Sequence, residues 1–231
     1  MLFLLLALGG PQDDKAAEEA LDAFRAAMRS AVEAERVAAV VDLAKVRHPK
    51  VLQKLVGLLS SDGATVRLAA AKGVSEFADL RKPASAALLS ALPPNAKLPA
   101  VQAGIVEALG VLKDPGALPP LHRLYDDKES VVAKAAVTAT VQFRSAASME
   151  PLLELLKKCD KALKQGDAAN VTAGTVAGYE VSARDEAERK RAQDLRPLVL
   201  KALQELSGES FQASVDWHAW WAKNKATFRP K

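Results

Sequence analysis

The stretch VQAGIVEALGVLKDPGALPPLHRL, residues 101–124, decides the fold of this chain. Its pattern predicts an apolar helix, a short Asp-Pro turn and a second apolar helix. The same design returns before and after it at intervals of about 31 to 35 residues. Repetition at this interval is typical of arrays in which each helix pair stacks on its neighbours. Aromatic residues make up only 5% of the chain, which argues against a sheet because aromatic and β-branched residues are the strand formers.

Apolar residues recur at helical spacing in the first helix of successive units. Their steps of four, three and four residues place each set on one face of an α-helix. The sets are Val66, Ala70, Gly73 and Phe77; Val101, Ile105, Ala108 and Leu112; and Val132, Ala136, Ala139 and Phe143. The third member is always small, as the close approach of a neighbouring helix requires.

The second helix of each unit carries its own stripe, which begins with proline in three of four copies. Proline costs no hydrogen bond in the first turn of a helix, so its recurrence marks helix starts. The copies are Pro49, Leu52, Leu55 and Leu58; Pro83, Ala86, Leu89 and Leu92; Pro115, Leu118, Leu121 and Leu124; and Ala146, Met149, Leu152 and Leu155. The predicted helix pairs are 30–47 with 48–60, 62–79 with 83–93, 97–113 with 115–126, and 129–144 with 146–158.

The repeated pattern is V-x-x-x-A/I-x-x-A/G-L-x-x-L followed by D-P-x-x-L-x-x-L. It resembles the short HEAT repeats of bacteria, including the HEAT-like repeats of phycobilin lyases. The resemblance covers four HEAT-like repeats in residues 30–158. It implies an all-α fold, an α-solenoid in which HEAT-like helix pairs form a right-handed superhelix. It leaves the function open, because one fold serves many functions.

Three further segments flank or interrupt this array. Residues 1–10 contain a bare apolar run before small residues, which is typical of a truncated signal peptide. This run predicts export to the periplasm or the cell exterior, and a buried first element in a cytoplasmic protein is the alternative. Residues 13–29 contain neither Gly nor Pro and predict an N-terminal capping helix. Residues 159–183 are small, polar and Gly-containing, and they predict a flexible insertion loop.

Residues 184–231 predict a C-terminal helical cap with a Trp cluster and a basic tail. Pro197 is expected to kink or restart the long helix of this segment. The spacing of the three tryptophans places their indoles on one side of a short helix. The predicted structural cap, which closes the apolar end of the array, consists of Phe211, Trp217, Trp220 and Trp221. An exposed aromatic patch that binds a peptide, a glycan or another ligand is the alternative.

The net positive charge of the chain is concentrated at its end. The sequence has 32 basic and 28 acidic side chains, which gives a net charge of +4. Residues 222–231 carry four basic side chains and no acidic one, so the preceding residues are neutral overall. A nucleic-acid groove needs basic residues clustered on one face of the fold, so this distribution argues against a nucleic-acid partner. No stretch of the sequence approaches the ~20 apolar residues that a membrane span needs.

The sequence carries no recognisable catalytic motif. It lacks the GxSxG elbow, the P-loop and a GxGxxG after a strand. His48, His122 and His218 are dispersed and the chain has a single cysteine, so neither a metal nor a cofactor is predicted. Cys159 has three lysines nearby in sequence, which would lower the pKa of an exposed thiol. An inert thiol is the simpler interpretation.

These observations predict a non-catalytic interaction or scaffold module that binds a protein or peptide on the concave face of the solenoid. We expect a monomer, and we do not expect an enzyme. The candidate partner-binding residues are polar positions outside the apolar stripes, Lys54, His122, Arg123, Glu150 and Glu154. The resemblance also leaves two enzymatic alternatives. One is similar to bilin lyases, and the other is similar to HEAT-fold DNA glycosylases that remove alkylated bases.

Overall fold

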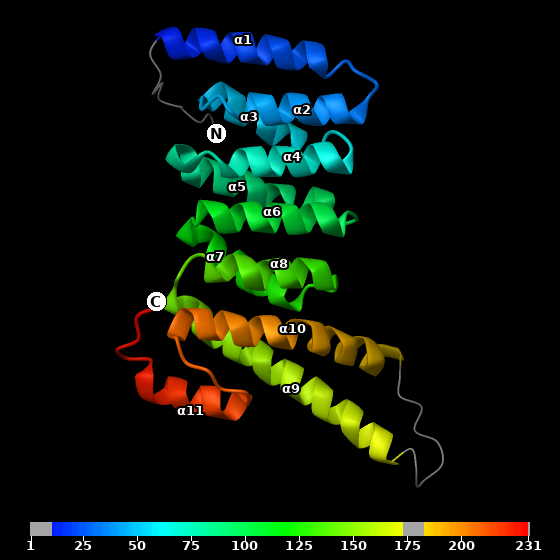
Figure 1. The fold of residues 1–231 in the computed structure, drawn as a ribbon, viewed down its shortest axis with the longest axis vertical. Coiled ribbons are helices and arrows are strands. Elements are labelled where there is room, and N and C mark those ends of the chain that lie inside the picture. Colours follow the sequence, from blue (N-terminus) through cyan, green and yellow to red (C-terminus); the bar gives the residue numbers. More distant parts are fainter. Residues whose placement is uncertain (1–10, 173–182, 231) are drawn as a thin grey trace. The chain divides into compact units, whose positions relative to one another are not determined.

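The computed structural model describes residues 11–172 and 183–230 (Figure 1). All regular structure in these two ranges is helical, with no strand. The chain divides into two compact units, Met1–Ala117 and Leu118–Lys231. The fold is therefore the predicted all-α solenoid of helix pairs, while the handedness of its superhelix stays a prediction. The predicted signal segment, residues 1–10, lies outside the described residues.

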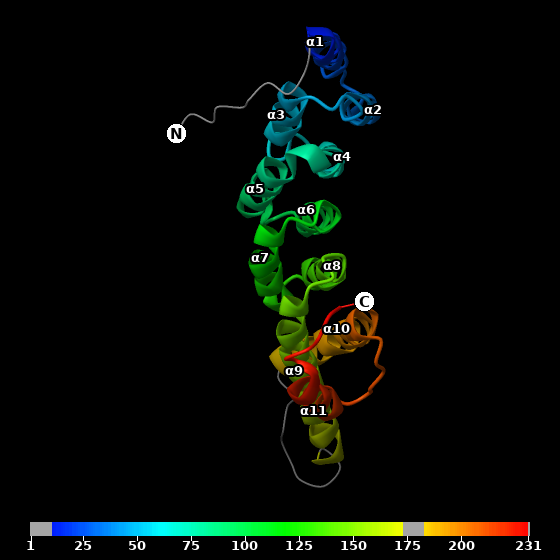
Figure 2. The same cartoon turned by 90° about the vertical axis from the view of Figure 1, so that its left-hand side faces the viewer.

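The first unit contains six α-helices and three short 3₁₀ helices in its described part. They are α1 (Pro11–Ala27), α2 (Glu33–Leu43), α3 (Pro49–Leu58), α4 (Ala64–Ser75), η1 (Ala78–Leu80), α5 (Arg81–Ala91), η2 (Pro93–Asn95), α6 (Pro99–Leu112) and η3 (Pro115–Ala117). Helices α2, α4 and α6 form one layer, and α3 and α5 form the second (Figure 2). Helix α1 packs against α2 and α3, at the place where the capping helix was expected.

The apolar stripes of α4 and α6 form much of the core of the first unit. Every position of the two predicted sets that begin at Val66 and Val101 is buried. Gly73 shows why the third position of the set is small. A Cβ atom added at Gly73 would lie 2.9 Å from the Cβ atom of Ala44. The spacing between α2 and α4 therefore depends on a missing side chain.

The buried face of α5 differs from the predicted one. The helix begins at Arg81, two residues before Pro83. It buries Ala84, Ser85, Leu88 and Ala91, in place of the predicted Pro83, Ala86, Leu89 and Leu92. Proline is tolerated throughout the first turn of a helix, so it did not fix the helix start. The prediction of this stripe was wrong because alanine occupies several positions of the helix, so its apolar pattern is weak.

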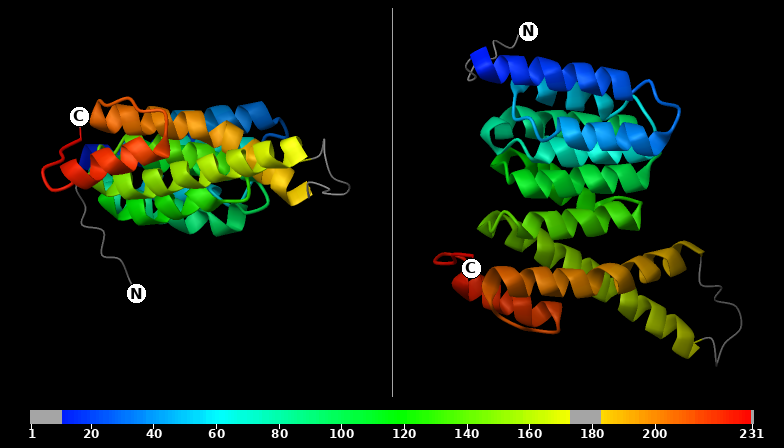
Figure 3. Two further views of the ribbon diagram at one scale, coloured as in Figure 1. Left: turned by 90° about the horizontal axis from the view of Figure 1, so that it is seen from below. Right: turned by 45° about the horizontal axis from the view of Figure 1, so that its top comes forward.

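The second unit contains a short helix pair followed by long helices. Its elements are α7 (Leu118–Arg123), η4 (Leu124–Asp126), α8 (Ser130–Val141), η5 (Ala146–Ser148), α9 (Met149–Thr172), α10 (Ala183–Ser207) and α11 (Ser214–Asn224). Helix α10 packs against α8 and α9, and α11 packs against α9. Helices α9 and α10 cross obliquely and diverge toward the ends at which residues 172 and 183 lie (Figures 1 and 3).

Two expectations for this part of the chain need correction. Residues 159–172, predicted as part of a flexible loop, continue α9, because Ala, Lys, Leu and Gln are strong helix formers. Residues 173–182 of that predicted loop lie outside the described residues. The predicted helix 115–126 is divided into η3, α7 and η4. Pro119 and Pro120 each lack the N–H group that a continuous helix needs.

Helix α10 continues through Pro197, at which a kink or a restart was expected. The proline lies inside the helix and withholds one N–H group from the hydrogen-bond ladder. Leu195 and Val199 on either side of it are buried. Packing of this apolar face therefore maintains the helix across the missing hydrogen bond.

Lys113 and Arg144 support the equivalence of two successive repeats. Each directly follows the last member of an apolar set, Leu112 and Phe143. Both adopt a left-handed backbone conformation, with φ of 53° and 46°. Such a conformation costs a non-glycine residue about 1 kcal/mol, so its presence at matching positions indicates a shared way of turning the chain.

Candidate functional site

An open cleft of about 840 Å³ lies in the second unit, between η4, α8, α9 and α10. Its floor is apolar and includes the buried side chains of Leu155, Ala192 and Leu195. Five basic and three acidic side chains also line it, which gives an excess of two positive charges. The charged residues are Lys128, Lys158, Lys161, Lys190, Arg191, Asp126, Glu188 and Asp194.

Two of the acidic side chains are already engaged by lysines. The ammonium group of Lys158 lies 2.7 Å from a carboxylate oxygen of Asp126. Lys134, which does not line the cleft, lies 2.8 Å from Asp194, and its hydrogen bond lowers the pKa of that carboxyl group. The negative charge of Asp126 and Asp194 is therefore largely satisfied within the protein.

The remaining cations of the cleft differ in their surroundings. Arg191 donates hydrogen bonds to the main-chain carbonyl oxygens of Tyr125 and Asp127, and so ties α10 to η4. Lys128, Lys161 and Lys190 are exposed. None of these three forms a hydrogen bond or ion pair with another described residue, although Lys190 helps to lower the pKa of Asp194. The cleft thus presents three lysines whose positive charge is not engaged in an ion pair within the described residues.

Cys159 also lines the cleft, and its thiol is unreactive. Its side chain is 3% exposed. Burial, followed by the negative charge of Asp160, raises the pKa of the thiol to about 11. The nearby cations act in the opposite direction but are outweighed. The thiol is therefore protonated at neutral pH, as expected for an inert cysteine.

His122 and Ser148 form a contact that resembles a nucleophile with its base. His122 Nε2 lies 3.0 Å from Ser148 Oγ. Ser148, however, is fully buried, so no substrate reaches its hydroxyl group. Burial lowers the pKa of His122. The pair instead joins α7 to η5, next to the buried hydrogen bond of 2.6 Å between Tyr125 and Thr140.

The five residues predicted to bind a partner are divided between the two units. Lys54 belongs to the first unit, where its ammonium group lies 5.4 Å from the ring centroid of Phe24. The other four belong to the second unit. Glu150 accepts a hydrogen bond of 3.3 Å from the indole of Trp221. Only Arg123 and Glu154 among these four are exposed and make no hydrogen bond or ion pair within the described part of the chain.

The aromatic cluster lies on α11 and in the segments directly before and after it. Trp217 is fully buried, and its indole N–H donates a hydrogen bond of 3.0 Å to the carbonyl oxygen of Phe211. Trp220 and Trp221 are half-buried, and both contact the ring of Phe228 edge-on. Sequence analysis missed Phe228 because it lies beyond the helix that carries the tryptophans. These ring contacts all lie within residues 211–228, and the role of the cluster as a cap of the array stays a prediction.

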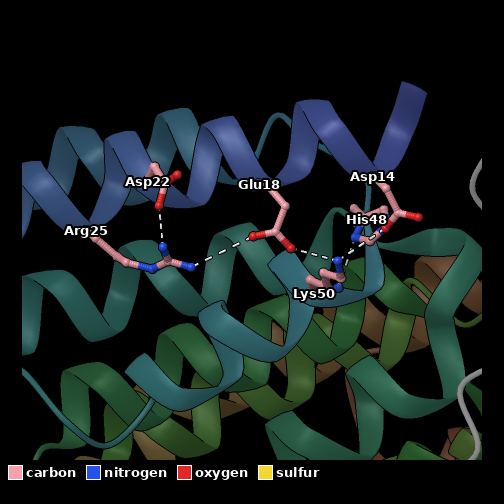
Figure 4. Close-up of polar contacts among 6 residues, drawn as sticks. All are labelled: Asp14, Glu18, Asp22, Arg25, His48 and Lys50. Carbon is pink, nitrogen blue, oxygen red and sulfur yellow. Dashed lines mark hydrogen bonds and ion pairs between the residues drawn. The ribbon is translucent and has the colours of Figure 1, made fainter. Parts of the chain in front are cut away.

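A second polar cluster lies in the first unit, between α1 and the start of α3 (Figure 4). Lys50 lies 2.7 Å from Glu18, and this hydrogen bond lowers the pKa of Glu18 and raises that of Lys50. His48 Nδ1 accepts the main-chain N–H of Lys50 at 3.2 Å. His48 Nε2 therefore carries the hydrogen that faces Asp14, at 3.3 Å. The cluster caps the N-terminus of α3 and links α1 to it.

The described residues also bear on metals and membranes. Within residues 11–172 and 183–230, no three His, Cys, Asp or Glu side chains gather closely enough to hold a metal ion. No helix in these ranges is both long enough and apolar enough to cross a membrane.

Comparison with known proteins identifies the repeated helix pairs. The family model described as HEAT repeats matches residues 85–171. Residues 85–171 are HEAT repeats. They include the η4, α8 and α9 walls of the cleft, whereas α10 follows them in sequence. A search of curated proteins found no match.

Proposed function

We propose that this HEAT-repeat protein is a non-catalytic interaction module that binds another protein through the cleft of its second unit. One observation carries the proposal: the cleft combines a buried apolar floor with a charged rim. Protein interfaces have the same plan, with an apolar centre inside a polar border. Stacked helical repeats are also a common means of presenting an extended binding surface.

The chemistry of the second unit supports a binding role over a catalytic one. Its two nucleophile candidates are both shielded, because the thiol of Cys159 is buried with a raised pKa and the hydroxyl of Ser148 is buried. No observation on the described residues favours a bilin-lyase-like or DNA-glycosylase-like activity. The polar residues of the cleft are therefore assigned to recognition.

Photo-crosslinking in the cells that produce the protein tests this proposal. A photoreactive amino acid is placed at Ala187, which lines the cleft and is exposed. The matched control places it at Ala96, which is also exposed but belongs to the first unit. We expect a covalent adduct with another protein from position 187 and none from position 96. No protein adduct at 187, or equal adducts at both positions, would contradict the proposal.

A further inference from the structure

We infer that the partner segment that occupies this cleft is acidic and also carries apolar side chains. The inference rests on the proposed function and adds the chemistry of the partner. Three features of the cleft lead to it: three lysines without an ion pair to another described residue, the pairing of two of its three acids with lysines, and apolar lining residues that are partly exposed.

The three exposed lysines come from separate parts of the chain. Lys128 precedes α8, Lys161 lies on α9 and Lys190 lies on α10. Packing of α8, α9 and α10 brings them to one cleft, so the positive charge surrounds the opening. Carboxylates of a partner would form ion pairs with them at the rim.

Two of the three acidic residues of the cleft do little to oppose such a partner. Asp126 is paired with Lys158, and Asp194 is paired with Lys134. Arg191 is held by two carbonyl oxygens, which satisfy its donors but leave its positive charge in place. A partner carboxylate therefore meets a net positive field and does not have to displace an existing ion pair of the three lysines.

The floor of the cleft adds a second requirement. Ala187 is exposed and Ala162 is half-buried, and both line the cleft beside the buried Leu155, Ala192 and Leu195. A purely ionic ligand would leave this surface in contact with water, whereas an apolar side chain between two acidic ones would cover it. The matching ligand is thus a peptide segment that alternates acidic and apolar residues.

A nucleic acid fits the same cleft less well. Three carboxylates line the cleft, and none of its lining residues is aromatic. Proteins that hold single strands combine a basic groove with aromatic side chains on which the bases stack. The charge alone would attract phosphates, but the cleft offers nothing to bind the bases.

Fluorescence anisotropy with the full-length protein tests the inference. The probe is a labelled short peptide of Glu and Leu, and its twin of the same length contains Gln and Leu. We expect the acidic peptide to bind and the neutral twin to bind at least about tenfold more weakly. Binding should also weaken as salt is raised toward about 1 M, at which the screening length is only ~3 Å.

Variants locate the binding to the cleft. The triple variant Lys128→Gln/Lys161→Gln/Lys190→Gln should weaken binding of the acidic peptide by at least about tenfold, because each rim ion pair contributes up to about 1 kcal/mol. The triple Lys→Arg variant at the same positions should retain it. The matched control, Lys82→Gln/Lys97→Gln/Lys113→Gln, removes three exposed lysines of the first unit and should leave the affinity unchanged. Equal thermal stability of all variants shows that the fold is intact.

Three outcomes would overturn the inference: equal binding of the two peptides, unchanged affinity in the cleft variant, or tighter binding of a single-stranded oligonucleotide. These outcomes are distinct from failure of the proposed function. A protein adduct at position 187 that persists in the Lys→Gln cleft variant keeps the interaction module and rejects an acidic partner. Absence of any protein adduct at position 187 rejects the interaction module itself.

Discussion

Two glycines in α3 and α4 differ in what a methyl group would meet. A Cβ atom at Gly57 has no neighbouring atom within 4 Å, whereas one at Gly73 would press on Ala44 Cβ at 2.9 Å. Gly57→Ala should raise the free energy of unfolding by about 0.5 to 1 kcal/mol, because alanine favours the helix. Gly73→Ala should lower it by at least about 1 kcal/mol despite the same helix preference. Urea denaturation measures both, and a similar effect of the two changes would contradict the close packing of α2 and α4.

Asp160 holds three helices of the second unit together. One carboxylate oxygen lies 2.7 Å from Arg196 Nε on α10, and the other accepts the main-chain N–H of Ser214 on α11 at 3.1 Å. Burial alone would raise the pKa of Asp160, but the hydrogen bonds from Arg196 and Ser214 together hold it below its ordinary value of 3.8.

The lowered pKa of Asp160 predicts a pH-dependent stability. The carboxylate stabilises the fold fully above its unfolded pKa of about 3.8, and this contribution is lost as pH falls through the lower folded pKa. Asp160→Asn should therefore cost about 2 kcal/mol at pH 7, typical of hydrogen bonds to a charged group. The difference from the unaltered protein should shrink below about pH 4. Denaturation curves across this pH range check it, and a difference that is independent of pH would contradict it.

The short helix α11 depends on one indole more than on the others. Trp217→Ala should lower the free energy of unfolding of the second unit by about 3 to 5 kcal/mol, because the fully buried indole leaves a cavity. Trp221→Ala should cost clearly less, because this indole is half-buried and its hydrogen bond to Glu150 is exposed. Circular dichroism during denaturation compares the two variants. Equal losses would contradict the different burial of the two indoles.

The structure shows where sequence patterns predict helices well and where they do not. The sets that begin at Val66 and Val101 were placed correctly, because both faces follow the 3.6-residue period of a helix. The face of α5 was misplaced, because alanine occupies several of its positions and its pattern is weak. Residues 159–172 were assigned to a loop on the basis of polarity, although an exposed helix is also polar.

At the scale of the whole molecule, the sequence did not predict the cleft. Its lining comes from residues 126–130, 155–162 and 187–195, and only the packing of α8, α9 and α10 brings these segments together. Sequence analysis looked for binding residues on the second helices of the repeats. It also placed the excess charge in the C-terminal tail, because a count along the chain does not show which lysines are paired in space.

Hydrogen exchange of the full-length protein, with and without the partner identified by photo-crosslinking, tests the central claim most directly. If the second-unit cleft is the binding site, the partner should slow exchange in residues 126–130, 155–162 and 187–195. Residues 11–117 should exchange at the same rate in both samples. Protection confined to residues 11–117, or no protection in the three segments of the cleft, would contradict the claim.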